Sequence, residues 1–266
     1  MKKFVIASTN EHKIFEFQEM LKPFDIKVVP YKTLLKNDFE VEETGKTFAE
    51  NAKLKAEAIC EKTGLPTFAD DSGFCVKDLG GFPGLVSSRF AEEIGGYENA
   101  YEEIKNRLGG RCSEAKFVCN IAFAQKGEET VQFEGQCYGF TVFPARGEDG
   151  FGYDPIFVPN SYGKTFAEMS EDEKNSISHR ALAVEKFVDY LSNLEKKKES
   201  GTAVKPLKTK ASKIEAKVEE STETPLVLEV KKEENFVLND NIFNVEVDEK
   251  FDMPNIPFVS DSDEEN

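Results

Sequence analysis

The sequence predicts an α/β fold in which a mixed central sheet is flanked by helices. Short apolar segments typical of buried strands alternate with longer segments whose apolar residues recur every three or four positions, as on one face of a helix. In the middle of the chain, two alternating apolar segments are separated by a short polar turn and predict a β-hairpin. Strands and helices mixed along the chain in this way imply an α/β fold with a mixed sheet.

The first strand, helix and second strand are predicted within the first thirty residues. Phe4–Ala7 is a short apolar segment typical of a buried strand. Ser8, Thr9 and Asn10 follow it and offer a turn and a helix cap. The apolar residues of Glu11–Leu21 are spaced for one face of a helix, and Ile26–Val29 predicts the second strand.

The next elements enclose a pair of acidic residues. Thr47-Phe48-Ala49-Glu50 matches a capping box and opens a predicted helix, Thr47–Thr63, which Gly64 ends. A short strand that begins at Thr67 should end at Asp70 and Asp71.

The second half of the chain begins with a helix and the hairpin. Tyr97–Leu108 predicts a helix, and Ala115–Ala124 pairs with Thr130–Phe143 across the turn. A glycine-rich loop and a polar segment follow, and an amphipathic helix then runs from about His179 to Leu194.

Basic residues occupy the first turns of the first and last predicted helices. Lys13 lies in one first turn, and His179 and Arg180 open the other. The positive end of a helix dipole repels a cation by about 0.3–1 kcal/mol, and a bound anion would reverse that effect. A solvated surface cation explains either case alone. Together the two junctions predict a multiply charged anion between two helix starts.

Acidic residues at two places predict a metal site. Adjacent residues on a strand face opposite sides, so only one of Asp70 and Asp71 can face a given site. Glu42 and Glu43 precede the capping box, and one of them could join that aspartate. Such a pair suits Mg²⁺, which takes one or two carboxylates and fills its other positions with water and phosphates. Ordinary loop acidity is the alternative for each pair alone.

Aromatic residues and glycines crowd the loop GFGYDPIF, Gly150–Phe157, and Lys174 lies in the polar segment after it. Basic helix starts, a carboxylate pair and this loop together indicate a site for the phosphates of a nucleotide.

Five motifs in order and register resemble one family. They are STNEHK, EETG…FAENAKLKA, ADDSG…LGGFPGLVSSRFA, GFGYDPIF and KNSISHRALA. With these motifs the chain resembles the inosine/xanthosine triphosphate pyrophosphatases, which hydrolyse dITP, ITP and XTP. The resemblance runs from about Lys2 to about Leu194, and it implies two lobes with the active site in the cleft between them.

The resemblance also implies a mechanism, the Mg²⁺-dependent hydrolysis of the triphosphate to monophosphate and pyrophosphate. Glu43 and Asp71 would hold the metal, and Asp71 would also orient or deprotonate the attacking water. Lys13, Lys53, Lys174 and Arg180 would neutralise the phosphates, Phe151 would stack on the base, and Asp154, His179 and Arg180 would read its polar edge. The predicted substrate-binding residues are Ser8, Thr9, Asn10, Glu11, His12, Lys13, Lys53, Ser72, Phe151, Gly152, Tyr153, Asp154, Lys174, His179 and Arg180.

The composition of the chain indicates its binding partners and its cellular compartment. A formal net charge of −16 argues against a nucleic-acid-binding protein, for which a basic footprint is expected. Since no apolar segment is long enough to span a bilayer, we expect no membrane association. Five scattered cysteines indicate reduced thiols and a cytoplasmic protein. The resemblance further implies a homodimer.

Two other functions remain open at this point. A nucleotide pyrophosphatase of different base specificity would carry the same phosphate site. A nucleotide-binding module with a tail-mediated interaction role would not need the carboxylate Asp71.

The domain division is predicted at residue 194. Residues 1–194 form the catalytic domain, and 195–266 form a charged extension that is first lysine-rich and then acidic. Its low hydrophobicity and high charge predict disorder, because little apolar surface is available to offset the ordering entropy. Its apolar segments, Pro225–Val230, Asn235–Val247 and Asn255–Val259, could contact an unidentified partner or the enzyme's own surface.

Overall fold

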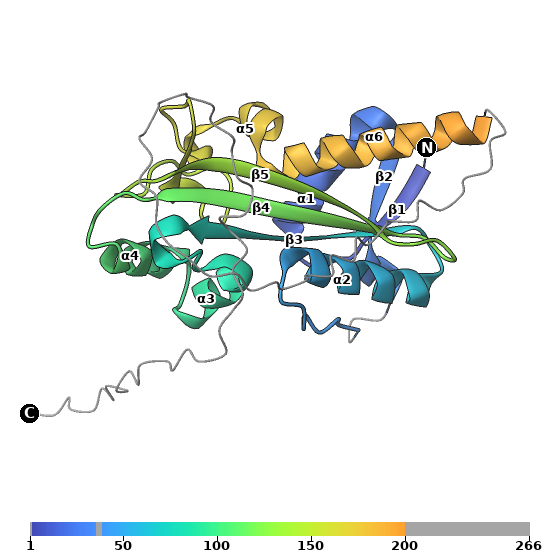
Figure 1. The fold of residues 1–266 in the computed structure, drawn as a ribbon, viewed down its shortest axis with the longest axis horizontal. Coiled ribbons are helices and arrows are strands. Elements are labelled where there is room, and N and C mark those ends of the chain that lie inside the picture. The colour runs from blue at the N-terminus through green and yellow to red at the C-terminus, as the bar shows by residue number, and fades with distance from the viewer. Residues whose placement is uncertain (1, 36–38, 200–266) are drawn as a thin grey trace, which may run out of the picture.

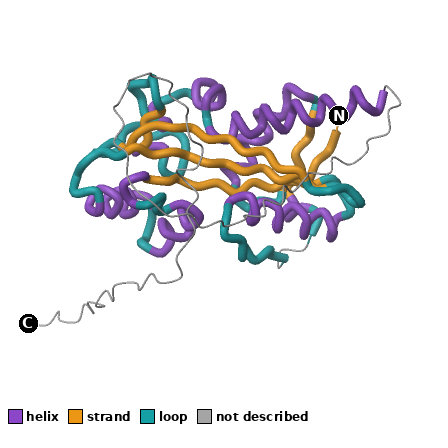
Figure 2. The backbone as a smooth tube through the Cα atoms, viewed as in Figure 1, coloured by secondary structure: helices purple, strands orange, loops and turns teal. Residues whose placement is uncertain are grey.

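The computed structural model describes residues 2–35 and 39–199. Within these residues one mixed six-stranded sheet has the order β2-β1-β3-β4-β5-β6, with helices on both sides (Figures 1 and 2). The predicted α/β fold is therefore confirmed. The strands are β1 Lys2–Ile6, β2 Ile26–Pro30, β3 Thr67–Val76, β4 Glu114–Ala124, β5 Val131–Thr141 and β6 Phe157–Pro159. The α-helices are α1 Glu11–Leu21, α2 Phe48–Thr63, α3 Ser87–Glu93, α4 Tyr97–Arg107, α5 Glu171–Ile177 and α6 His179–Glu199.

The pairing of strands in the sheet changes from parallel to antiparallel at β3. Strand β1 is parallel to both β2 and β3, whereas β3, β4, β5 and β6 are successively antiparallel. The β1–β3 register covers only Val5 with Thr67 and Ile6 with Phe68. From Ala69 onward β3 keeps its pairing with β4, while β1 has already ended. Past Phe68, one side of β3 is therefore no longer paired with β1.

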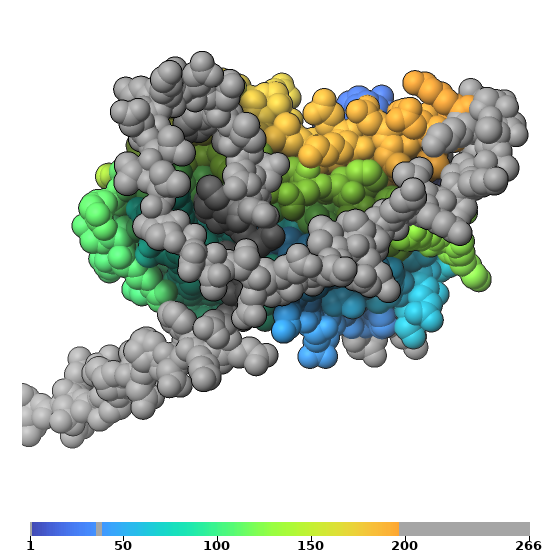
Figure 3. Space-filling view, in the orientation of Figure 1, coloured from blue at the N-terminus to red at the C-terminus, as the bar shows by residue number. Residues whose placement is uncertain are grey.

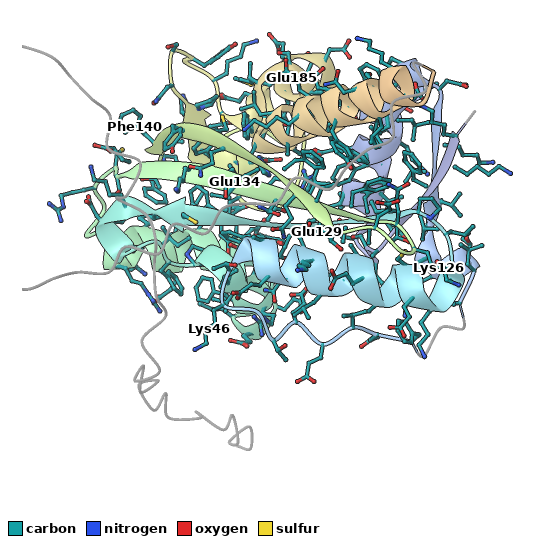
Figure 4. All side chains as sticks on the ribbon, turned by 45° about the vertical axis from the view of Figure 1, so that its right-hand side comes forward. Lys46, Lys126, Glu129, Glu134, Phe140 and Glu185 are labelled. Atoms are coloured by element: carbon teal, nitrogen blue, oxygen red, sulfur yellow. The ribbon has the colours of Figure 1, made fainter. Side chains whose placement is uncertain are left out.

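Two lobes share the long strands β3, β4 and β5, which run across the molecule in Figure 1. In one lobe, α1 and α6 pack on the sheet around Phe17, Phe68 and Phe187. In the other, aromatic rings around Phe74 and Phe117 pack with residues of α3 and α4. The space-filling view shows β5 between α6 and α2 (Figure 3). The side-chain view places Lys126 and Glu129 at the β4–β5 turn (Figure 4).

Helix ends follow the local sequence signals. The Asn10 side chain accepts a hydrogen bond from the Lys13 amide at 3.1 Å, and Gly64 ends α2 with φ of 68°. Thr47 accepts from the Glu50 amide at 3.1 Å, as the predicted capping box requires. The Glu50 carboxylate, however, accepts from the Lys46 amide at 2.6 Å and so bonds one residue before the cap.

Some element boundaries differ from the prediction. Strand β3 does not end at Asp71 but continues to Val76, because Phe74 and Val76 are buried in register with β4. The polar segment before α6 contains the short helix α5, which opens with a true capping box between Ser170 and Glu173. Helix α3 and the short strand β6 were also not predicted.

Helix α6 runs to Glu199 and so passes the predicted domain boundary at Leu194. The rest of the predicted extension, residues 200–266 with its three apolar segments, lies outside the described residues. The division of the chain into two regions therefore stays a prediction. In the part of the chain that is described, none of the helices has the length and apolarity needed to cross a bilayer.

The start of α6 packs directly on the backbone of β5 at Gly135. A Cβ at this position would lie 2.1 Å from the His179 carbonyl oxygen and 2.5 Å from the Ala183 amide nitrogen. We expect Gly135→Ala to lower the free energy of unfolding by about 1–3 kcal/mol, because backbone atoms would have to move apart. Chemical denaturation measures this loss.

Gly163→Ala is the matched control, because no described heavy atom lies within 4 Å of a Cβ there. If the two variants unfold at the same denaturant concentration, α6 does not press on β5 as described.

Candidate active site

The candidate site lies where β1 ends beside β3. Ser8–Lys13 follows β1, and Asp70 and Asp71 lie on β3 just past its last pairing with β1. In open α/β sheets, ligands bind outside the carboxyl ends of such strands. A cleft of about 400 Å³ opens at this point, and its volume falls within the usual range for small-molecule sites.

Most of the residues predicted from sequence line this cleft. Glu11, His12 and Lys53 do not. The predicted residues that line it are Ser8, Thr9, Asn10, Lys13, Glu43, Asp71, Ser72, Phe151, Gly152, Tyr153, Asp154, Lys174, His179 and Arg180.

Lys55, rather than Lys53, extends from α2 into the cleft. The Lys53 side chain is half exposed, and its Nζ lies 3.9 Å from Glu57, one turn along the helix surface. Lys55 Nζ lies 2.7 Å from Glu43 and 3.1 Å from Asp71. The helical spacing explains the difference, because Lys55 follows buried Asn51 by four residues and shares its face. That spacing was the available signal, and the sequence prediction did not use it.

Asp71 faces the α2 side of β3. Its carboxylate accepts hydrogen bonds from Asn51 at 3.3 Å and Lys55 at 3.1 Å. Burial raises the pKa of Asp71, and the neighbouring Lys55 cation opposes that shift. Glu43 lines the cleft beside it, whereas Glu42 does not, so Glu43 is the glutamate positioned next to Asp71.

Asp70 faces the opposite side, as the alternation of strand side chains predicts. Its Oδ2 lies 3.0 Å from Lys13 Nζ and 3.5 Å from Arg180 Nη2, and it accepts from Ser72 Oγ at 2.9 Å. Burial alone would raise the pKa of Asp70, but Lys13 and Arg180 hold it well below its usual value. Asp70 is therefore a buried anion shared by the first turns of α1 and α6.

Glu16 on α1 completes the charge network, and the sequence prediction missed it. Its carboxylate accepts from Lys174 at 2.7 Å and forms a second ion pair with Arg180. Lys174 also lies 2.8 Å from Asp154. Buried carboxylates thus offset the cations at the helix starts, for which the sequence had predicted a bound anion alone.

The loop from Gly150 to Asp154 is held from both sides. Asp154 accepts from the Phe151 amide at 2.8 Å, and the Tyr101 hydroxyl donates to the Gly152 carbonyl. His12 lies outside the cleft but stacks on Phe151 with ring centroids 5.1 Å apart and planes 12° apart. An aromatic ring at the cleft wall is thus held in a defined orientation.

His179 is buried at the start of α6 and stacks on Phe117 at 4.8 Å. Burial, together with the Arg180 and Lys174 cations, lowers the pKa of His179 well below its ordinary value, so its ring is neutral. Its Nδ1 has no hydrogen-bond partner among the described residues. A buried ring nitrogen without a partner at a cleft wall can bind a polar group of a ligand.

The donor chemistry fits a hard metal ion at one place. Glu43 and Asp71 each lie within 3.1 Å of the same Lys55 nitrogen, so two carboxylates converge there. The described residues contain no cluster of three or more histidine, cysteine or acidic ligands. Two carboxylates without further protein ligands match Mg²⁺, which usually keeps several waters and binds substrate phosphates.

The ion pairs of Asp70 predict a measurable loss of stability. In Asp70→Asn, Lys13 and Arg180 lose their shared anion, and we expect a loss of about 3–5 kcal/mol in the free energy of unfolding. Asp149→Asn, at an exposed loop position, should change little. Urea denaturation at pH 7 compares the variants, and equal losses would contradict the buried-anion role.

The same pairing predicts the pH dependence. Because the pKa of Asp70 is lower folded than unfolded, its stabilisation is present above about pH 4 and is lost as the pH falls further. The wild type should therefore lose more stability between pH 5 and pH 3 than Asp70→Asn does.

Comparisons with known proteins identify the family to which this chain belongs. The "dITP/XTP pyrophosphatase" of Oceanobacillus iheyensis is 39% identical over 197 residues, which cover 73% of this chain and 100% of the relative. The protein of the same name from Bacillus subtilis is 44% identical over 192 residues, covering 70% of this chain and 96% of the relative. The solved structure of the Staphylococcus aureus Ham1 protein aligns with a TM-score of 0.66 at 40% identity, covering 73% of this chain and 100% of that one. A sequence model of the Ham1 family matches residues 4–190, and the chain belongs to the Ham1 family.

Proposed function

We propose that this chain hydrolyses non-standard purine nucleoside triphosphates (dITP, ITP and XTP) to the monophosphate and pyrophosphate, with Mg²⁺ as cofactor. The names of the relatives support the substrate class. The observation that carries the proposal is one cleft lined by the Glu43–Asp71–Lys55 cluster and by Lys13 and Arg180. Both of these cations pair with the buried Asp70.

Glu43 and Asp71 would hold the metal ion. When bound, Mg²⁺ would neutralise phosphate charge and help align the substrate. Lys55 now occupies the position between the two carboxylates and would turn its charge to the phosphates.

Asp71 is the proposed general base. It would accept a proton from the attacking water, whose oxygen bonds to one phosphorus of the α–β bridge. The bond from that phosphorus to the bridging oxygen breaks, and the bridging oxygen leaves with the electron pair. Asn51 donates a hydrogen bond to this carboxylate and holds it in a defined orientation for the transfer.

The phosphates would bind at the two helix starts. Lys13, Lys174 and Arg180 would supply positive charge, and their buried carboxylate partners hold them in place before the substrate arrives. Ser8, Asn10 and Ser72 would donate hydrogen bonds. Binding groups positioned in advance lose less entropy when the substrate binds.

The purine would stack on Phe151 beside His179. A 6-keto purine presents an acceptor oxygen where adenine presents an amino group. The neutral His179 ring has a free Nδ1, and with a hydrogen on that atom it would donate to the keto oxygen. Asp154 positions Phe151 through its amide and thereby supports the base site.

We further propose that the protein is cytoplasmic. Its five cysteines are free thiols, four of them buried, which suits a reducing compartment. The homodimer stays a prediction from the family resemblance, and analytical ultracentrifugation tests it.

Product analysis tests the reaction. With Mg²⁺, purified protein should convert ITP, dITP and XTP to monophosphate and pyrophosphate, and it should act on ATP much more slowly. Chromatography distinguishes pyrophosphate from phosphate. Asp71→Asn should lower turnover by about 10²–10⁴-fold, the range for loss of a general base.

Release of inorganic phosphate would contradict the proposed bond cleavage. Equal rates on ATP and ITP would favour a pyrophosphatase of other base specificity. Tight binding without turnover would favour a nucleotide-binding module.

Two lysines on α2 provide a matched comparison. Lys55→Gln removes the cation shared by Glu43 and Asp71 and should lower kcat/KM for ITP by about 10-fold or more, as expected for a charged hydrogen bond. Lys53→Gln removes only a surface cation and should stay within about twofold, since exposed ion pairs contribute little. Steady-state kinetics with the reverse order would restore the original prediction for Lys53.

A further inference from the structure

The basic side chains at the proposed phosphate site are already paired. Lys13 pairs with Asp70, Lys55 with Glu43 and Asp71, and both Lys174 and Arg180 pair with Glu16. These cations position a substrate, but their charge is largely offset before it binds. A cation in the cleft that is not already paired would therefore add to the positive charge available to a triphosphate.

Arg89 on α3 is a cation of a different kind. It lines the same cleft, is exposed, and has no ion pair with any of the described residues. Glu92, one helical turn away, accepts the Ser88 hydroxyl at 3.1 Å instead. The guanidinium of Arg89 is therefore available to a ligand in the cleft.

The cleft wall formed by Gly84–Val86 and the start of α3 carries Arg89, and hydrogen bonds attach it to β3, the strand that carries Asp71. Ser87 Oγ accepts from the Phe74 amide at 3.0 Å and donates to the Gly84 carbonyl at 2.6 Å. Beside them, a Cβ on Gly73 would lie 2.3 Å from the Gly84 oxygen and 2.9 Å from the Phe48 ring. The turn before α3 and the first residue of α2 thus converge on β3, two residues past Asp71.

The same wall is also attached to the base loop, because the Tyr153 hydroxyl donates to the Ser87 carbonyl at 2.9 Å. Arg89 follows Ser87 by two residues. Its backbone therefore has a fixed place relative to both the carboxylates and the loop, while its side chain is free to reach a ligand.

We propose that Arg89 binds the outer phosphates of the nucleoside triphosphate and the pyrophosphate formed from them. This inference rests on the proposed function. A guanidinium suits the role because its planar fork of donors can bind two phosphate oxygens at once.

The test separates the two halves of the substrate. In Arg89→Gln, the calorimetric Kd for pyrophosphate with Mg²⁺ and the KM for ITP should both rise by about 10-fold or more. The Kd for the monophosphate IMP should change less than about twofold. Arg89→Lys keeps a point charge and should recover part of the pyrophosphate affinity.

Arg111→Gln serves as the control, because Arg111 is exposed and outside the cleft, with its Nε donating to the Leu108 carbonyl at 3.3 Å. It should match the wild type in every measurement. Thermal unfolding should show that Arg89→Gln is as stable as the wild type, so weaker binding would not reflect misfolding.

Unchanged pyrophosphate affinity in Arg89→Gln would overturn the inference and leave Arg89 a solvated surface residue. Equal weakening of IMP and pyrophosphate would also overturn it, because the contact would then not distinguish the outer phosphates. Calorimetry does not depend on turnover. A wild type that binds pyrophosphate through Arg89 but does not hydrolyse ITP would contradict only the proposed function.

Discussion

The enclosure of Asp70 between Lys13 and Arg180 is the interaction on which the rest of the site depends. The three residues come from β3, α1 and α6, elements that are far apart in the sequence. Taking a charge out of water costs several kcal/mol unless its partners are well placed. The observed placement of the two helix starts relative to the strand satisfies this requirement, and it also brings Ser8 and His179 to the cleft.

The local parts of the structure could be predicted from sequence, and the long-range pairings could not. Apolar spacing predicted α1, a capping-box sequence and a terminal glycine predicted α2, and two alternating segments predicted the hairpin. Alternation on a strand also predicted that Asp70 and Asp71 face opposite sides. Glu16 had no such signal, because its partners Lys174 and Arg180 lie more than 150 residues away along the chain. The continuation of β3 past Asp70 and Asp71 could not be predicted from the local sequence either. The charges of these two aspartates are compensated by residues that no local pattern identifies.

The paired charges also suggest how a site for a polyanion remains folded when empty. Four cations crowded together without partners would repel one another and destabilise the protein. Here each has a carboxylate, so a substrate would exchange partners with groups already in position. The electrostatic environment is then organised before binding, the condition under which charge stabilisation is most effective in catalysis.

The strands β3, β4 and β5 cross both lobes without interruption. Two lobes joined by flexible linkers can move together and close on a ligand. Lobes that share one sheet are instead connected by the hydrogen bonds between its strands. The Phe151 loop and the carboxylate pair therefore lie on parts of the molecule that one continuous sheet connects. A ligand that contacts both the Phe151 loop and the carboxylates must therefore be long enough to span the cleft between them.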